Sequence, residues 1–225
     1  PPRSTLFPYT TLFRSLSDIA AMGARPRFAL LAGALPDNDD AWLGAFARGL
    51  FALAQVHAVD VVGGDTTRGP RNLCMTLLGD APAGTAIRRS GAREGDDVWV
   101  SGTLGDAMLA LAVIEGRASL SPAAFEHARG RLELPSPRVT LGEALRGVAT
   151  AAIDVSDGLT GDLAHILSQS GVGASVDRAA LPRSAAMDEA LAGPHRALAL
   201  GCLVAGGDDY ELCFTASRAH RDRVE

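Results

Sequence analysis

Apolar residues recur along the chain in patterns that predict both helices and short strands. Between residues 39 and 57, Trp42, Phe46, Leu50 and Leu53 follow one another at three- and four-residue spacing, which predicts an amphipathic helix. Continuous apolar runs bounded by turn residues predict buried strands. Such strands are expected at residues 28–35, 59–62, 72–79, 96–102, 151–156 and 173–177, with a strand–turn–strand over 203–216. Further helices are expected from Leu16 to about Gly23 and over residues 104–116, 121–148 (broken by Pro135 and Pro137), 158–170 and 184–192.

The order of these elements predicts an α+β fold made of two mixed α/β domains. Strands and helices alternate irregularly, and some strands follow each other directly, which argues against one doubly wound sheet. We expect a leader over residues 1–15, foreign or disordered, because it lacks a clear period. A partial N-terminal domain is expected over 16–85 and a C-terminal domain, truncated at its end, over 86–225.

Composition excludes several classes of protein. The 225 residues carry a net charge of −5, which argues against nucleic acid as a partner. No apolar run approaches the roughly 20 residues of a membrane span, so a cytoplasmic protein without a membrane partner is expected. All 21 basic residues are arginine, which excludes a Walker-A loop and a Schiff-base lysine. Three cysteines, scattered through apolar runs, predict buried free thiols in a reducing compartment.

Four acidic turns are the strongest chemical signal in the sequence. They are Ser17-Asp18, Gly63-Gly64-Asp65-Thr66-Thr67, Asp154-Val155-Ser156-Asp157-Gly158 and Gly206-Gly207-Asp208-Asp209-Tyr210-Glu211. Three of them follow apolar, strand-like runs, and carboxylates that converge from separate loops can hold Mg²⁺. Aspartate and glycine are also ordinary turn residues, so a single turn of this kind has a purely structural interpretation.

Other features have structural interpretations beside the functional ones. Asp157 could cap the helix that follows it. The pair Gly102-x-x-Gly105 could hold phosphate at a helix amino end, although a tight strand–helix turn is favoured. Arg68 and Arg71 could reach phosphate or remain solvated. Core positions are favoured for Trp42 and Trp99, and structural roles for His57 and His165.

Taken together, the motifs resemble one enzyme family. LSDIAAMGARP, VVGGDTTRGP, RRSGAREGDDVWVSGTLGDA, LPSPRVTLGEAL, AIDVSDGLTGDLAHI and GGDDYELCF occur in this order between Leu16 and Phe214. This set is similar to thiamine-monophosphate kinases, a family of the aminoimidazole ribonucleotide synthetase-like superfamily. The resemblance implies direct transfer of the γ-phosphate of ATP to thiamine monophosphate, several Mg²⁺ ions, and a homodimer formed through the N-terminal domain.

The resemblance also assigns roles to individual positions. It implies that Mg²⁺ is held by Asp18, Asp65, Asp154 and Asp157, with Gly64 and Asp65 at the nucleotide. Arg88 would contact the ATP phosphates, Ser156 would contact ATP, and Glu211 would contact the thiamine substrate. No nucleophilic side chain is implied, because phosphoryl transfer depends on positioning and charge neutralisation.

The chain also departs from the family pattern. A GDDAA-type loop and a further Asp-containing loop, expected upstream of Ser17-Asp18, are absent from this sequence, as is an aromatic substrate contact near the carboxyl end. We therefore expect the full parent protein to act on thiamine monophosphate and this chain alone to be inactive. Three alternatives stay open: another ATP-using enzyme of the superfamily, a non-catalytic fragment that dimerises or binds nucleotide, and a metal-dependent phosphatase.

Overall fold

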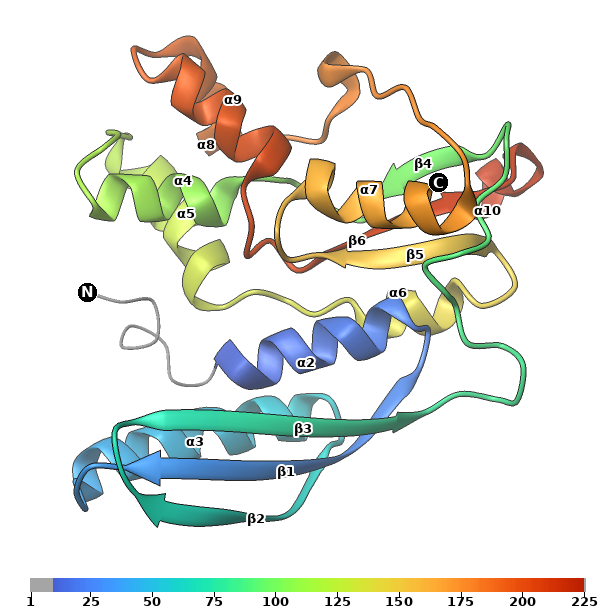
Figure 1. Ribbon diagram of the computed structural model, residues 1–225. Helices are drawn as coiled ribbons and strands as arrows, with labels where there is room; N and C mark the ends of the chain where they lie inside the picture. The colour runs from blue at the N-terminus through green and yellow to red at the C-terminus, as the bar shows by residue number, and fades with distance from the viewer. Residues whose placement is uncertain (1–9, 225) are drawn as a thin grey trace.

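The computed structural model describes residues 10–224, which form two three-stranded sheets with a helix between them (Figure 1). The strands are β1 (Arg25–Leu35), β2 (Asp60–Arg68), β3 (Asn72–Asp80), β4 (Asp97–Val100), β5 (Ala149–Val155) and β6 (Glu211–Ala216). The α-helices are α2 (Thr10–Ala21), α3 (Asp40–Val56), α4 (Asp106–Ile114), α5 (Pro122–Glu133), α6 (Val139–Ala144), α7 (Leu159–Ser170), α8 (Ala185–Ala192), α9 (Arg196–Ala205) and α10 (Arg221–Val224). Two 3₁₀ turns are η1 (Arg178–Ala180) and η2 (Arg218–His220).

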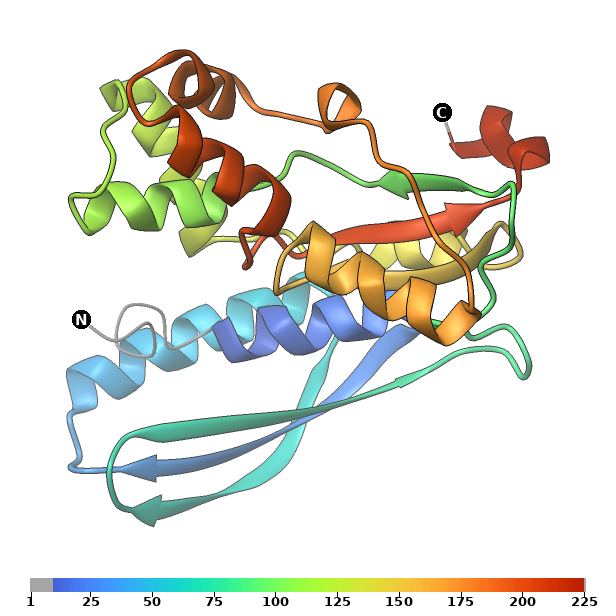
Figure 2. The same ribbon diagram turned by 45° about the horizontal axis from the view of Figure 1, so that its top comes forward.

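The N-terminal sheet has the order β2-β1-β3, with β2 parallel and β3 antiparallel to the central strand. Helices α2 and α3 both cover one face of this sheet (Figure 2). Alternate residues of β1 therefore differ in exposure: Ala29 is buried, whereas Phe28 and Leu30 on the other face are 40% and 38% exposed. The outer face of the sheet thus presents apolar side chains to solvent.

The C-terminal sheet is antiparallel throughout, with the order β4-β6-β5. Its two faces belong to different cores. Ala152 and Phe214 pack in the cluster that contains α2, whereas Ile153 and Cys213 pack in the cluster that contains α7. Burial on both faces explains why β5 and β6 are almost continuously apolar in sequence.

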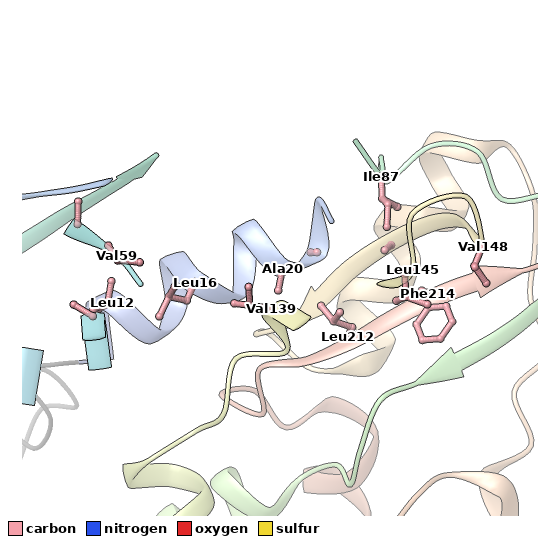
Figure 3. Close-up of a cluster of buried hydrophobic side chains, with 14 of the residues drawn as sticks. Leu12, Leu16, Ala20, Val59, Ile87, Val139, Leu145, Val148, Leu212 and Phe214 are labelled. Atoms are coloured by element: carbon pink, nitrogen blue, oxygen red, sulfur yellow. The ribbon is translucent and has the colours of Figure 1, made fainter. Parts of the chain in front are cut away.

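Helix α2 connects the two sheets through one hydrophobic core. Its residues Leu12, Leu16 and Ala20 are fully buried, and they pack in one cluster with Val59 beside the N-terminal sheet and Leu212 of the C-terminal sheet (Figure 3). The structure thereby confirms the α+β expectation.

The boundaries of several predicted elements differ from the structure, and two of these differences affect predicted site residues or segments. Helix α2 begins at Thr10, six residues before the predicted start, because buried Leu12 and Phe13 extend its apolar face. Residues 10–15 are therefore part of a helix and not of a disordered leader, while residues 1–9 lie outside the described part of the chain. Strand β2 continues to Arg68, so Gly64 and Asp65 lie within a strand and not in a turn after it.

Two predicted strands are absent from the described residues. The segment 173–177 is irregular, and residues 203–205 form the last turn of α9, so only the second half of the predicted strand–turn–strand is a strand. The apolar run at 197–205 fits a helix as well as a strand, and its length allows the helix. Within residues 10–224, no helix is long and apolar enough to cross a membrane.

Candidate functional site

Two predicted metal ligands, Asp18 of α2 and Asp154 of β5, lie close enough for their charges to interact. Burial raises the pKa of Asp154 to about 6, and the negative charge of Asp18 adds to this rise. Partial burial also raises the pKa of Asp18, while Arg89 and Arg14 oppose that rise. Because like charges in a partly buried site repel each other, this pair is suited to a cation that neutralises both.

The hydroxyl of Ser17 lies beside the same pair. It is buried and offsets part of the rise in the pKa of Asp154. The Ser17-Asp18 turn of the sequence therefore lies within a helix, where it meets the carboxyl end of β5.

The loop after β5 carries the predicted ligands Ser156 and Asp157, and a buried carboxylate determines its shape. Asp162 Oδ2 accepts the backbone N–H groups of Ser156, Asp157 and Gly158, each at 3.0 Å. Burial raises the pKa of Asp162, and these N–H groups oppose the rise. Asp157 does not cap α7, because the cap residue is Gly158. Asp162 was not among the residues predicted for the site, although an aspartate in the first turns of a helix is a recognisable signal.

The segment that contains Arg88 runs alongside β5. The carbonyl oxygen of Arg88 accepts the N–H of Ala152 at 3.0 Å, two residues before Asp154, and the N–H of Ile87 donates to Met22 beyond α2 at 2.9 Å. The backbone of Arg88 thus runs beside β5, and its side chain is exposed, so its predicted contact with phosphate stays a prediction. Its neighbour Arg89, which sequence reasoning did not select, is the arginine that acts electrostatically on Asp18.

Gly64 and Asp65 belong to a different part of the molecule. Asp65 pairs with Ala32 of β1, is exposed, and accepts the N–H of Thr66 at 2.9 Å. Among residues 10–224, no three His, Cys, Asp or Glu side chains gather closely enough to hold a metal ion. The structure thus brings Asp18 and Asp154 together and leaves Asp65 on the N-terminal sheet, so their shared metal role stays a prediction.

Glu211 is fully buried and has several hydrogen-bond partners. Its carboxylate accepts hydrogen bonds from Arg138 at 2.6 and 2.7 Å, from Arg131 at 2.6 Å and from Ser101 at 2.5 Å. Burial raises the pKa of Glu211, but the bonds from Arg138 and Ser101 bring it below its usual value. The structure therefore gives Glu211 a role in joining β4, α5 and the start of α6, and its predicted contact with substrate remains a prediction.

The neighbouring Asp209 occupies the amino end of α4. Its Oδ2 accepts the N–H of Gly105 at 2.8 Å, and Gly105 adopts the left-handed conformation with φ +82°. The Gly102-x-x-Gly105 pair thus makes a tight turn closed by an internal carboxylate.

Other predicted residues lie outside this region. The guanidinium of Arg71 lies 4.2 Å from the centre of the Trp42 ring, which places Trp42 at the edge of the core. Cys202 and Cys213 are buried as predicted, but Cys74 is exposed.

Two family models of known proteins match most of the chain. The model for the N-terminal domain of AIR synthase related proteins matches residues 7–81, and the model for their C-terminal domain matches residues 93–217. The chain therefore belongs to the family of AIR synthase related proteins.

Relatives with similar sequences are thiamine-monophosphate kinases. The enzyme of Salmonella typhimurium is 45% identical over 218 residues, and that of Escherichia coli K12 is 43% identical. Each alignment covers 96% of this chain and 66% of the relative, so the chain spans about two thirds of the length of these curated relatives. The crystal structure of thiamine-monophosphate kinase from Stenotrophomonas maltophilia K279a is 50% identical, with a TM-score of 0.89 over 96% of this chain and 69% of that one. A structure described as AaThiL complexed with AMPPCP and TMP is 26% identical, with a TM-score of 0.86 over 99% of this chain and 71% of that one.

Proposed function

We propose that the protein containing this chain transfers the γ-phosphate of ATP to thiamine monophosphate and forms thiamine diphosphate. The observation that carries the proposal is the Asp18–Asp154 pair, which the two halves of the chain contribute. Arg89 acts electrostatically on Asp18, and the Ser156–Asp157 loop directly follows Asp154. The similarity to thiamine-monophosphate kinases supports the choice of substrate, and the relative's complex with AMPPCP and TMP supports the choice of both ligands.

The residues at this site fit Mg²⁺. The donors are carboxylate oxygens, and Mg²⁺ is commonly held by one or two carboxylates while phosphates and water complete its shell. Asp18 and Asp154 would hold the ion, with Asp157 on the adjoining loop and Asp65 as the further ligand that the family resemblance implies. When bound, Mg²⁺ would neutralise charge on the phosphates. Arg88 would bind a phosphate, and Ser156 would orient the nucleotide.

The proposal includes a homodimer formed through the N-terminal sheet. Phe28, Leu30, Val62 and Leu78 are all large apolar residues of this sheet that are 38–56% exposed. Exposed apolar side chains gathered in this way are typical of a protein–protein interface. A cytoplasmic location is also part of the proposal, since the three cysteines are free.

Titration of the chain with ATP, with and without Mg²⁺, tests the proposal. We expect heat of binding only when Mg²⁺ is present, and Asp154→Asn should weaken this binding about tenfold or more because one metal ligand loses its charge. Release of ADP that depends on thiamine monophosphate, assayed in the full-length protein, identifies the acceptor. Light scattering on the same samples reports the oligomeric state.

Asp177→Asn is the matched control. Asp177 is an exposed aspartate of the same half of the chain, and its side-chain Oδ1 accepts the N–H of Ala179 in a 3₁₀ turn. This variant should bind Mg-ATP as the unaltered chain does. A chain that gives no Mg-dependent heat, or an Asp154→Asn variant with unchanged affinity, would contradict the proposed site.

A further inference from the structure

We propose that Asp162 is a positioning residue, which fixes the Ser156–Gly158 loop and occupies the three N–H groups of this loop in place of an external anion. Asp162 would act through the residues of this loop. Its effect on nucleotide binding rests on the proposed function, whereas its effect on the loop does not. No role was predicted for it from the sequence.

The geometry of the loop carries this inference. One carboxylate oxygen of Asp162 accepts three successive backbone N–H groups at the same distance of 3.0 Å. Successive N–H groups directed at one point form a concave anion site, and the free N–H groups of a helix amino end commonly bind phosphate. Here Asp162, which is only 3% exposed, already occupies that position. The loop is therefore organised around an anion from its own chain.

Two further contacts show that the loop has one defined conformation. The N–H of Asp208 donates to Ser156 at 2.9 Å, and the N–H of Tyr210 donates to Val155 at 2.9 Å. Gly158 adopts φ +108° and packs so closely on Ala205 that a Cβ at this position would lie 2.5 Å from its carbonyl carbon. The backbone is thus held from the α7 side by Asp162 and from the other side by residues 205–210.

This arrangement has a consequence for nucleotide binding. Because Asp162 fills this N–H site, the phosphates of a nucleotide cannot bind to the N–H groups of Ser156, Asp157 and Gly158. We expect phosphates beside this loop to be bound by side chains and by any cation that Asp154 and Asp157 hold. Asp162 would then contribute through the position of Ser156 and Asp157, since a displacement of about 1 Å at such groups can cost up to a hundredfold in rate.

Amide hydrogen exchange on the ligand-free chain tests the effect on the loop. In Asp162→Ala, the amides of Ser156, Asp157 and Gly158 should exchange about tenfold faster or more relative to those of β6, because each loses a hydrogen bond to a charged acceptor. Asp162→Asn keeps one acceptor oxygen and should restore part of the protection. Unchanged protection of these amides in Asp162→Ala would overturn the inference.

Titration with Mg-ATP separates positioning from a general loss of stability. Leu163→Ala is the matched control, because the buried Leu163 side chain stabilises the same helix through apolar packing and makes no bond to the loop. We expect Asp162→Ala to weaken binding about tenfold and Leu163→Ala to leave it within about twofold. Equal weakening in both variants would overturn the positioning role. If the unaltered chain binds no Mg-ATP, the proposed function fails and the exchange experiment alone decides the inference.

Discussion

At the scale of single residues, the buried carboxyl group of Asp209 has a pKa far above its usual value. Burial raises its pKa to about 8; the Gly105 N–H and the charge of Arg131 oppose the rise, and Asp106 and Glu211 add to it. Its Oδ1 has no hydrogen-bond partner among the described residues. The side chain is therefore largely protonated at pH 7, and it binds the Gly105 N–H as a neutral group.

The contribution of Asp209 to the stability of the protein should accordingly fall as the pH rises from about 4 to about 8. In this interval the folded state holds a proton on Asp209 that the unfolded state has released, so raising the pH favours unfolding. Asp209→Asn stays neutral and keeps an acceptor for Gly105. The difference in unfolding free energy between variant and unaltered chain should grow in favour of the variant, by up to about 4 kcal/mol from pH 5 to pH 8.

Thermal unfolding of both proteins across this pH range provides the measurement. Other groups that titrate here, such as His57, whose pKa is lowered by burial, occur in both proteins and cancel in the difference. A constant difference in Tm at every pH would show that Asp209 has an ordinary pKa.

At the scale of elements, the pairing of β2 with β1 depends on one glycine. The register shifts by one residue after Ala29, so that Leu31 lies opposite Gly64. Gly64 has φ +154°, and a Cβ there would lie 1.8 Å from the carbonyl oxygen of Leu31. This register shift brings the backbones of β1 and β2 close together at Gly64, where the sequence predicted a turn.

Gly64→Ala should therefore destabilise the N-terminal sheet by about 2 kcal/mol or more, because the new methyl group displaces the β1 backbone. Gly63→Ala is the adjacent control: its Cβ would meet only the Leu30 side chain at an ordinary 3.6 Å. The control should be neutral or slightly stabilising, since alanine loses less entropy than glycine on folding. Urea unfolding of the two variants checks the contrast, and equal midpoints would contradict the structure of this pairing.

These elements also show what the sequence could predict. The helix at 39–57 was found because its signal is local: the apolar period and the Asp39 cap lie within the segment itself. The extent of β2 depends on β1, whose paired residues lie more than thirty positions earlier in the chain, so local turn residues were misleading. The same holds for the site. The motifs predicted Asp18 and Asp154 as ligands, and the structure brings these two residues together. Asp162 and the arginines around Glu211 depend on contacts that only the folded chain provides.

At the scale of the whole molecule, the two sheets are not independent, because α2 lies in a core shared by both. Close packing of α2 on α6 maintains this core. Gly142 of α6 lies so near α2 that a Cβ at this position would be 2.1 Å from the carbonyl oxygen of Ala20. Helix α2 also carries Asp18, so its packing on α6 determines whether Asp18 lies close to Asp154.

Gly142→Ala should consequently weaken both halves together. Overpacking at this crossing should cost about 2 kcal/mol or more, because the helix backbones must separate. Gly130→Ala in α5 is the matched helical control; nothing lies within 4 Å of its Cβ position, so it should gain up to about 1 kcal/mol. The chain has two tryptophans, Trp42 in α3 and Trp99 in β4, and single-tryptophan versions of each variant report on the two halves separately. Both probes should shift to the same lower urea midpoint in Gly142→Ala. A shift confined to one tryptophan would mean that the halves unfold separately and that the core around α2 does not couple them.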